Sequence, residues 1–300
     1  MDIKIEPLKE QIDNWIEIYS PNRDLFFIRN EDIADFEEYL HDVLVMPRDE
    51  FFQHSSYKQI QLVNSYEYWN VSKEAEYIIV ANPDWINNIP TQMKKELFKI
   101  QVKMNRGLVL PLSLFSDASV IPKEHIVEDE EKRFVVIQNT MWKQLPYEVK
   151  EHLIKSLAQE WDDWNCCEVP EQAPLHLRKY ANTFSTMSGS NCLAATLFAI
   201  SNSEWIIHEW VHPKTFENGL KRANYILVDD DLCDGDVVTW VNSDGVVQHA
   251  SYYIGNNLFF NKYGQTFFNP WKIVSWNELK EEWKRYEINI YRGIRKNKIK

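Results

Sequence analysis

The stretch GDVVTWVNSDGVVQHASYYIG, residues 235–255, decides the expected fold of the C-terminal half. Two runs of strand-forming residues, VVTWV and VVQHASYYI, flank Asn242–Gly245, a sequence typical of a tight hairpin turn. A second turn at Gly255–Asn257 leads into another strand-like run, LFFNKYG. The sequence therefore predicts an antiparallel sheet in this part of the chain.

A cysteine precedes this hairpin at the start of an apolar run. Asn191-Cys192 follows the small-residue loop SGS and opens LAATLFAIS, which predicts a helix from about Cys192 to Ser201. Unpaired amides at a helix N-terminus favour anions and therefore the thiolate form of a cysteine. Cys192 is a candidate nucleophile, and the alternative is a buried structural cysteine.

The second predicted strand carries a histidine. Side chains alternate between the two faces of a strand, so two sets of three are expected, namely His249, Ser251 and Tyr253 on one face and Ala250, Tyr252 and Ile254 on the other. We expect His249 to act as the general base for Cys192, with Asn261 of the next strand orienting the imidazole. The alternatives are a core histidine and an ordinary strand-edge asparagine.

These residues resemble the NlpC/P60 family of papain-like cysteine peptidases. The similarity rests on a cysteine at a helix start, Gly235–Val238 opening a strand, and His249 followed by Tyr253–Gly255, with a polar residue one strand later. It covers roughly residues 178–275. The resemblance implies an α+β, papain-like domain in which the Cys192 helix packs on an antiparallel sheet. It also implies that Tyr180, twelve positions before the cysteine, lines the site as an oxyanion donor.

The family's activity implies a cysteine hydrolase for this chain. Members cut amide bonds in peptidoglycan stem peptides, notably after γ-D-glutamate, while others are amidases or acyltransferases. The chain departs from the family pattern, with Asn191–Ala194 in place of Asp-Cys-Ser-Gly and with Asn261 where a histidine is commoner. The resemblance thus implies a small peptide or amide substrate, including cell-wall-derived γ-D-glutamyl peptides, and no cofactor.

Two other functions compete with this one. His208-Glu209-Trp210-Val211-His212 matches H-E-x-x-H, in which two histidines on one helix face bind zinc and the glutamate acts as base. Pro213 follows directly and disfavours helical geometry at His212. The last possibility is a non-catalytic binding protein on a peptidase-like fold.

Composition narrows the class of protein. The formal net charge of −12 argues against nucleic-acid binding, which relies on lysine and arginine. No apolar run reaches the length of about 18 residues that a membrane span needs, and the acidic N-terminus does not resemble a secretory signal. The four cysteines fit no zinc or disulfide spacing. These features predict a cytoplasmic protein.

The chain is expected to contain two domains, 1–165 and 175–300, because 161–180 contains two prolines and shows no clear periodicity. The first contains an internal repeat over about 77–101 and 134–158. Each copy has an apolar strand-like run, an asparagine, a tryptophan three positions later, a proline and a helix. We therefore expect a duplicated α/β module, which contributes to substrate selection or assembly.

Overall fold

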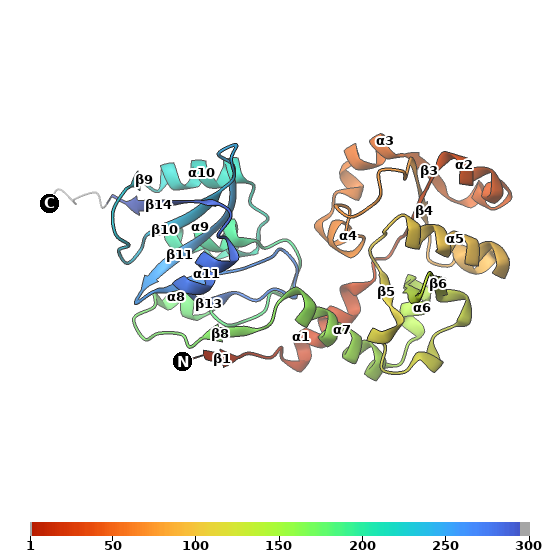
Figure 1. The fold of residues 1–300 in the computed structure, drawn as a ribbon, viewed down its shortest axis with the longest axis horizontal. Coiled ribbons are helices and arrows are strands. Elements are labelled where there is room, and N and C mark those ends of the chain that lie inside the picture. Colours follow the sequence, from red (N-terminus) through yellow and green to blue (C-terminus); the bar gives the residue numbers. More distant parts are fainter. Residues whose placement is uncertain (1, 295–300) are drawn as a thin grey trace. The chain divides into compact units, whose positions relative to one another are not determined.

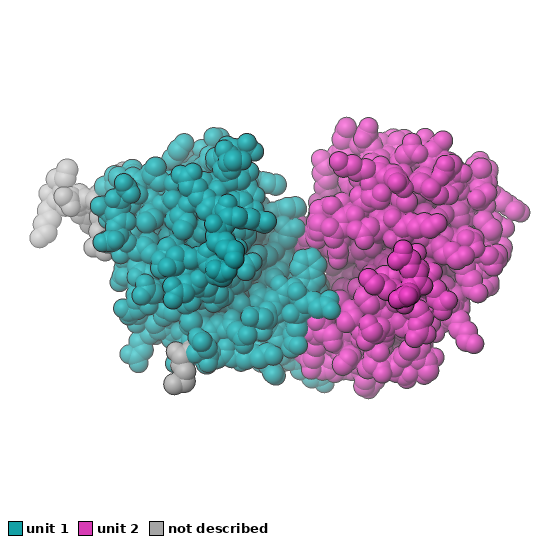
Figure 2. Space-filling view, viewed as in Figure 1, with its two compact units in different colours: residues 1–11, 158–300 teal, residues 12–157 magenta. Residues whose placement is uncertain are grey.

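The computed structural model describes residues 2–294, which form two compact units. Figure 2 colours them separately: unit 1 contains residues 1–11 and 158–300, and unit 2 contains residues 12–157. Both combine helices with antiparallel sheets, so the chain is an α+β protein. No helix within residues 2–294 is long and apolar enough to cross a membrane.

Unit 2 contains two small antiparallel sheets with the strand orders β2-β4-β3 and β5-β7-β6. The strands are β2 (Asp24–Ile28), β3 (Leu44–Pro47), β4 (Tyr77–Ala81), β5 (Val109–Pro111), β6 (Ile126–Asp129) and β7 (Lys132–Val136). The α-helices are α1 (Lys9–Tyr19), α2 (Asn30–Ile33), α3 (Arg48–Gln53), α4 (Ile60–Ser65), α5 (Thr91–Lys103), α6 (Asn139–Gln144) and α7 (Tyr147–Trp161), and six 3₁₀ turns (η1–η6) link them.

The two segments of the sequence repeat occupy equivalent places in these sheets. β4 and β7 are each the third strand of their sheet in chain order and its central strand, and each leads through a short helical turn into a long helix, α5 or α7. The tryptophans of the repeat are buried, and their indole N–H groups donate to backbone carbonyls: Trp85 to Tyr39 O and Trp142 to Ile16 O. The repeated tryptophans therefore serve packing within unit 2.

Unit 1 is built on a six-stranded antiparallel sheet with the order β13-β12-β11-β10-β14-β9 (Figure 1). Its strands are β9 (Tyr225–Val228), β10 (Val237–Val241), β11 (Val247–Gly255), β12 (Leu258–Asn261), β13 (Lys272–Ser275) and β14 (Glu287–Gly293). The helices are α8 (Leu175–Arg178), α9 (Cys192–Ser201), α10 (Pro213–Arg222) and α11 (Trp276–Glu282), with a 3₁₀ turn η7 (Glu204–His208). The predicted hairpin is present as β10–β11, and Gly245 takes the positive φ that its turn requires.

Helices cover both faces of this sheet. On one face, α9 and α10 pack on Val237, Val247 and Ala250. On the other face, Leu279 of α11 packs with a second apolar group that includes Trp240 of β10. α10 approaches α9 closely at Gly219, where an added Cβ would lie 2.7 Å from the Leu197 side chain. The core of unit 1 therefore has two layers, separated by the sheet.

The domain boundary differs from the one expected at residues 165–175. The division falls at residue 158, within α7, and residues 1–11 belong with the C-terminal unit. The reason is a strand pair that sequence periodicity does not indicate: β1 (Asp2–Lys4) pairs antiparallel with β8 (Asn165–Cys167). Short two-stranded pairings of this kind join distant segments and carry almost no local signal.

Candidate functional site

Cys192 is the first residue of α9, as predicted. Asn191 caps the helix, because its Oδ1 accepts a hydrogen bond of 3.0 Å from the backbone N–H of Ala194. The Asn191 side chain is held in turn by its Nδ2, which donates to Val211 O at 2.8 Å. The Asn191 side chain thus holds the start of α9 against the segment that contains Val211, and this fixes the position of the half-buried Cys192.

Two effects of opposite sign act on the Cys192 thiol. Burial raises its pKa to about 11, because a buried thiolate loses its hydration. The backbone N–H groups of Ala250, Leu193 and Cys192 itself lie against the sulfur and favour the thiolate, but they do not outweigh burial. The site therefore offers three donors to a negative charge at this point, while the resting thiol is protonated at neutral pH.

His249 and Asn261 meet across the β11–β12 pair. His249 Nε2 lies 2.7 Å from Asn261 Oδ1, and Ser251 Oγ donates to the same oxygen at 2.5 Å. Because that amide oxygen only accepts, His249 Nε2 carries the proton. The expected contact between histidine and asparagine is present. Burial lowers the His249 pKa to about 3, although the hydrogen bond to Asn261 favours the charged form.

The imidazole nevertheless faces away from the thiol. The His249 ring stacks on Trp283, with centroids 4.2 Å apart and planes 12° from parallel, and lies 5.4 Å from Trp240. This is the α11 face of the sheet. The next residue, Ala250, points to the α9 face, where it packs beside Cys192. The expected Cys192–His249 pair is therefore not formed, because the helix covers the opposite face of β11.

A lysine occupies the α9 side of the sheet instead. Lys262 follows Asn261 and is fully buried. Its Nζ donates to Thr266 O at 3.1 Å and to Asn269 O, and it lies 5.6 Å from the Trp271 ring centroid. Burial lowers the Lys262 pKa to about 7, partly offset by the charges of Asp162 and Cys192. Lys262 is thus within electrostatic range of the thiol and able to change charge near neutral pH.

The loop before Cys192 is tied to the loop that encloses Lys262. Gly189 N donates to Gln265 O at 2.8 Å. Within the described residues, the buried hydroxyl groups of Ser188 and Ser190 have no hydrogen-bond partner. A buried hydroxyl without a partner costs free energy, so these two groups are a local source of instability in the loop before α9.

Tyr180 is not brought to the cysteine. Its hydroxyl donates to the Glu204 carboxylate, and its ring contacts Phe198 at 5.2 Å between centroids. Phe198 lies about 9 Å along the helix axis from Cys192, since each residue advances a helix by about 1.5 Å. The expected role of Tyr180 as oxyanion donor is therefore wrong for this structure, because the tyrosine packs on the far half of α9.

The H-E-x-x-H motif does not form a zinc site. His208 ends η7, Glu209 lies beyond it in extended conformation, and His212 is the N-cap residue before Pro213. The two histidines thus lie on different elements, not on one helix face, as the proline before α10 requires. No group of three metal-ligating side chains occurs among residues 2–294. His208 packs on Trp271 and Tyr180, with centroids 5.8 Å away in each case.

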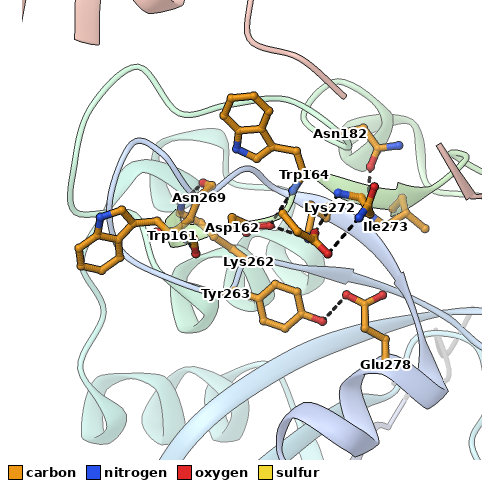
Figure 3. A network of polar contacts seen from close by, with 12 residues as sticks. Trp161, Asp162, Trp164, Asn182, Lys262, Tyr263, Asn269, Lys272, Ile273 and Glu278 are labelled. Atoms are coloured by element: carbon orange, nitrogen blue, oxygen red, sulfur yellow. Dashed lines mark hydrogen bonds and ion pairs between the residues drawn. The ribbon is translucent and has the colours of Figure 1, made fainter. Parts of the chain in front are cut away.

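A buried ion pair stabilises the α11 side of the sheet (Figure 3). Lys272 Nζ lies 2.7 Å from Asp162 Oδ1, and both side chains are 2% exposed. Burial disfavours the Lys272 ammonium, but the charge and hydrogen bond of Asp162 outweigh it and hold the Lys272 pKa above its ordinary value. Tyr263 donates to Glu278 at 2.7 Å in the same cluster. This network joins Asp162, the residue after α7, to β13 within unit 1.

Lys262 is the functional candidate that the sequence interpretation missed. The alternation of side chains along a strand could have indicated it. Lys262 follows β12 directly and is two positions after the apolar Phe260, so it lies on the same face of the sheet as Phe260. Phe260 packs with Ala195 and Phe198 of α9, which puts that face on the thiol side.

Comparisons of the chain with family profiles, curated proteins and solved structures found no match.

Proposed function

We propose that unit 1 is a cysteine hydrolase that cleaves an amide bond through the Cys192 thiol, with a base other than the histidine of the NlpC/P60 family. One observation carries the proposal: three backbone N–H groups and the Lys262 side chain act on the sulfur of a cysteine at a capped helix N-terminus. Backbone donors around one point favour a thiolate and, during reaction, an oxyanion. The substrate is a small peptide or amide, and γ-D-glutamyl peptides are the first class to test.

Lys262 takes the role of general base in this proposal. Its neutral amine has two N–H donors, which Thr266 O and Asn269 O accept, so these two hydrogen bonds do not use its lone pair. The proton moves from Cys192 to Lys262, the sulfur bonds to the amide carbon, and the C–N bond breaks. Lys262 returns the proton to the leaving amine. Water then bonds to the thioester carbon, the C–S bond breaks to release a carboxylic acid, and a proton of the water restores the thiol.

Activity on γ-D-glutamyl dipeptides tests the proposal. The protein is expected to release the free amine, and Cys192→Ser is expected to lose activity by at least about a hundredfold, as removal of a nucleophile does. Cys233→Ser is the matched control, since Cys233 is an exposed thiol in a loop of the same unit. Full activity of Cys192→Ser would contradict the proposal, as would loss of activity in the Cys233 variant alone.

A non-catalytic binding protein is the second candidate. The raised pKa of the Cys192 thiol and the enclosed His249 favour it, because neither group resembles an activated catalyst in the resting state. Titration calorimetry with the same dipeptides separates the two functions. Binding without turnover, with equal affinity in Cys192→Ser, supports the binding protein, while turnover supports the hydrolase.

A further inference from the structure

The strand β9 forms an unprotected edge of the large sheet. It pairs with β14 alone among the described strands, and its sequence, Tyr225–Val228, contains no charged residue, proline or glycine. Ile226 is 49% exposed and Leu227 is 58% exposed. As neighbours on one strand, they project from opposite faces of the sheet. Soluble proteins usually protect such edges with charges, proline or a covering element, and β9 has none of these within its own span.

The flanks of β9 carry opposite charges. Lys221 and Arg222 end α10 just before the strand, and the acidic run Asp229–Asp231 follows it. Lys221, Arg222, Asp229 and Asp230 are exposed. When two copies of such a strand run antiparallel, the basic flank of each lies beside the acidic flank of the other. The charge pattern is therefore complementary to itself.

We propose that β9 pairs antiparallel with β9 of a second copy of this chain, joining the two large sheets into one. In an antiparallel pair, two residues directly opposite either both turn their N–H and C=O groups toward each other or both turn them away, so the two-fold axis passes between two copies of one residue. With Ile226 opposite its own copy, Tyr225 of each strand lies opposite Leu227 of the other, and the basic end of α10 lies toward the acidic run of the other copy. The exposed Ile226 is then covered by its counterpart, and Leu227 by Tyr225 of the other copy. The inference is independent of the proposed hydrolase function.

The proposal fits an isologous, self-complementary interface, which is the commonest arrangement in homodimers. The backbone hydrogen bonds of the edge supply the attraction, and the charged flanks select the antiparallel direction over the parallel one. A parallel pairing would place Asp229–Asp231 of the two copies together. Pairing through β9 ends at two copies, because each molecule has one β9 edge.

Light scattering after size-exclusion chromatography of the full chain tests this. The wild type is expected to be dimeric at micromolar concentration, while Ile226→Lys and Leu227→Lys are expected to be monomeric, since an edge lysine opposes strand pairing. Leu175→Lys is the matched control, because Leu175 is 81% exposed on α8, and it is expected to remain dimeric. Circular dichroism of each variant confirms that the fold persists.

A charge exchange tests the antiparallel direction and leaves Asp230, which pairs with Arg292, unchanged. Lys221→Glu with Arg222→Glu is expected to weaken the dimer by at least about tenfold, as is Asp229→Lys with Asp231→Lys, and all four changes together are expected to restore it. A wild type that stays monomeric at the highest attainable concentration overturns the proposal. A dimer that persists unchanged in Ile226→Lys and Leu227→Lys also overturns it, because the contact then lies elsewhere.

Discussion

Cys192 and His249 lie on opposite faces of the six-stranded sheet, with the backbone of β11 between them. Ala250 packs beside Cys192 under α9, while the His249 ring stacks on Trp283 beyond α11. The imidazole is held by Asn261 and Ser251 and is enclosed by aromatic rings. Its role in this arrangement is to link β11 and β12, and any base for Cys192 must come from the α9 face.

The pH dependence of stability tests the enclosed state of His249. Its folded pKa of about 3 lies below the ordinary value of 6.5, so the folded state resists protonation. The contribution of His249 to the free energy of unfolding is fully present above pH 6.5. It decreases as the pH falls toward 3, by about 2 kcal/mol between pH 6.5 and 5. In urea unfolding, His249→Phe is expected to lose this part of the dependence. An unchanged slope in the variant would contradict the burial of the imidazole.

Lys262 gives a pH dependence in a different window. Its folded pKa of about 7 lies below the ordinary value of 10.5, so the wild type gains stability as the pH rises above 7. Between pH 7 and 8.5 the gain approaches about 1.4 kcal/mol per pH unit, and Lys262→Met is expected to lack it. The Cys192 thiol titrates above this window. Equal slopes in wild type and Lys262→Met would show that the lysine is not buried in this way.

The ion pair between Lys272 and Asp162 makes unit 1 sensitive to single substitutions. Lys272→Met is expected to destabilise the fold by about 3–5 kcal/mol, because it leaves the Asp162 carboxylate buried and unpaired. Lys272→Met with Asp162→Leu is expected to recover most of that loss. Thermal and urea unfolding of both variants measure the effect. A single variant as stable as the wild type would mean that the pair is open to water.

Metal analysis of the purified protein tests the placement of the two histidines. Because His208 and His212 lie on different elements, we expect no stoichiometric zinc after dialysis against a weak chelator. His208→Ala is expected to leave the metal content unchanged. One equivalent of zinc that disappears in His208→Ala would contradict the observed geometry and restore the metallopeptidase interpretation.

Much of unit 1 could be predicted from local sequence. The Asn242–Gly245 turn, the alternation along β11 and the start of the helix at Cys192 each depend on neighbouring residues, and each lies where expected. The face of the sheet that α9 covers depends on long-range packing instead. Alternation separates His249 from Ala250 but does not say which of the two meets the helix. The face of the sheet that α9 covers decides whether His249 or Lys262 lies on the same side as the Cys192 thiol.

The remaining outcomes divide between local chemistry and long-range packing. The proline after His212 already indicated that H-E-x-x-H would not be one helix, so local chemistry was sufficient there. Tyr180 lies at the family spacing from Cys192, yet its side chain packs against Phe198, a contact that spacing alone does not encode. The β1–β8 pair joins the start of the chain to Asn165–Cys167 in its middle without a periodic pattern.

The pH dependence of Cys192 alkylation tests the central claim most directly. Iodoacetamide labelling, followed by mass spectrometry, is to be compared in wild type, Lys262→Met and His249→Phe. We predict a rise in rate with an inflection near pH 7 in the wild type, kept in His249→Phe and lost in Lys262→Met, because the neutral Lys262 amine present above its pKa takes the thiol proton during the reaction, while the resting thiol stays protonated. An inflection that survives in Lys262→Met, or that disappears only in His249→Phe, would contradict the assignment of Lys262.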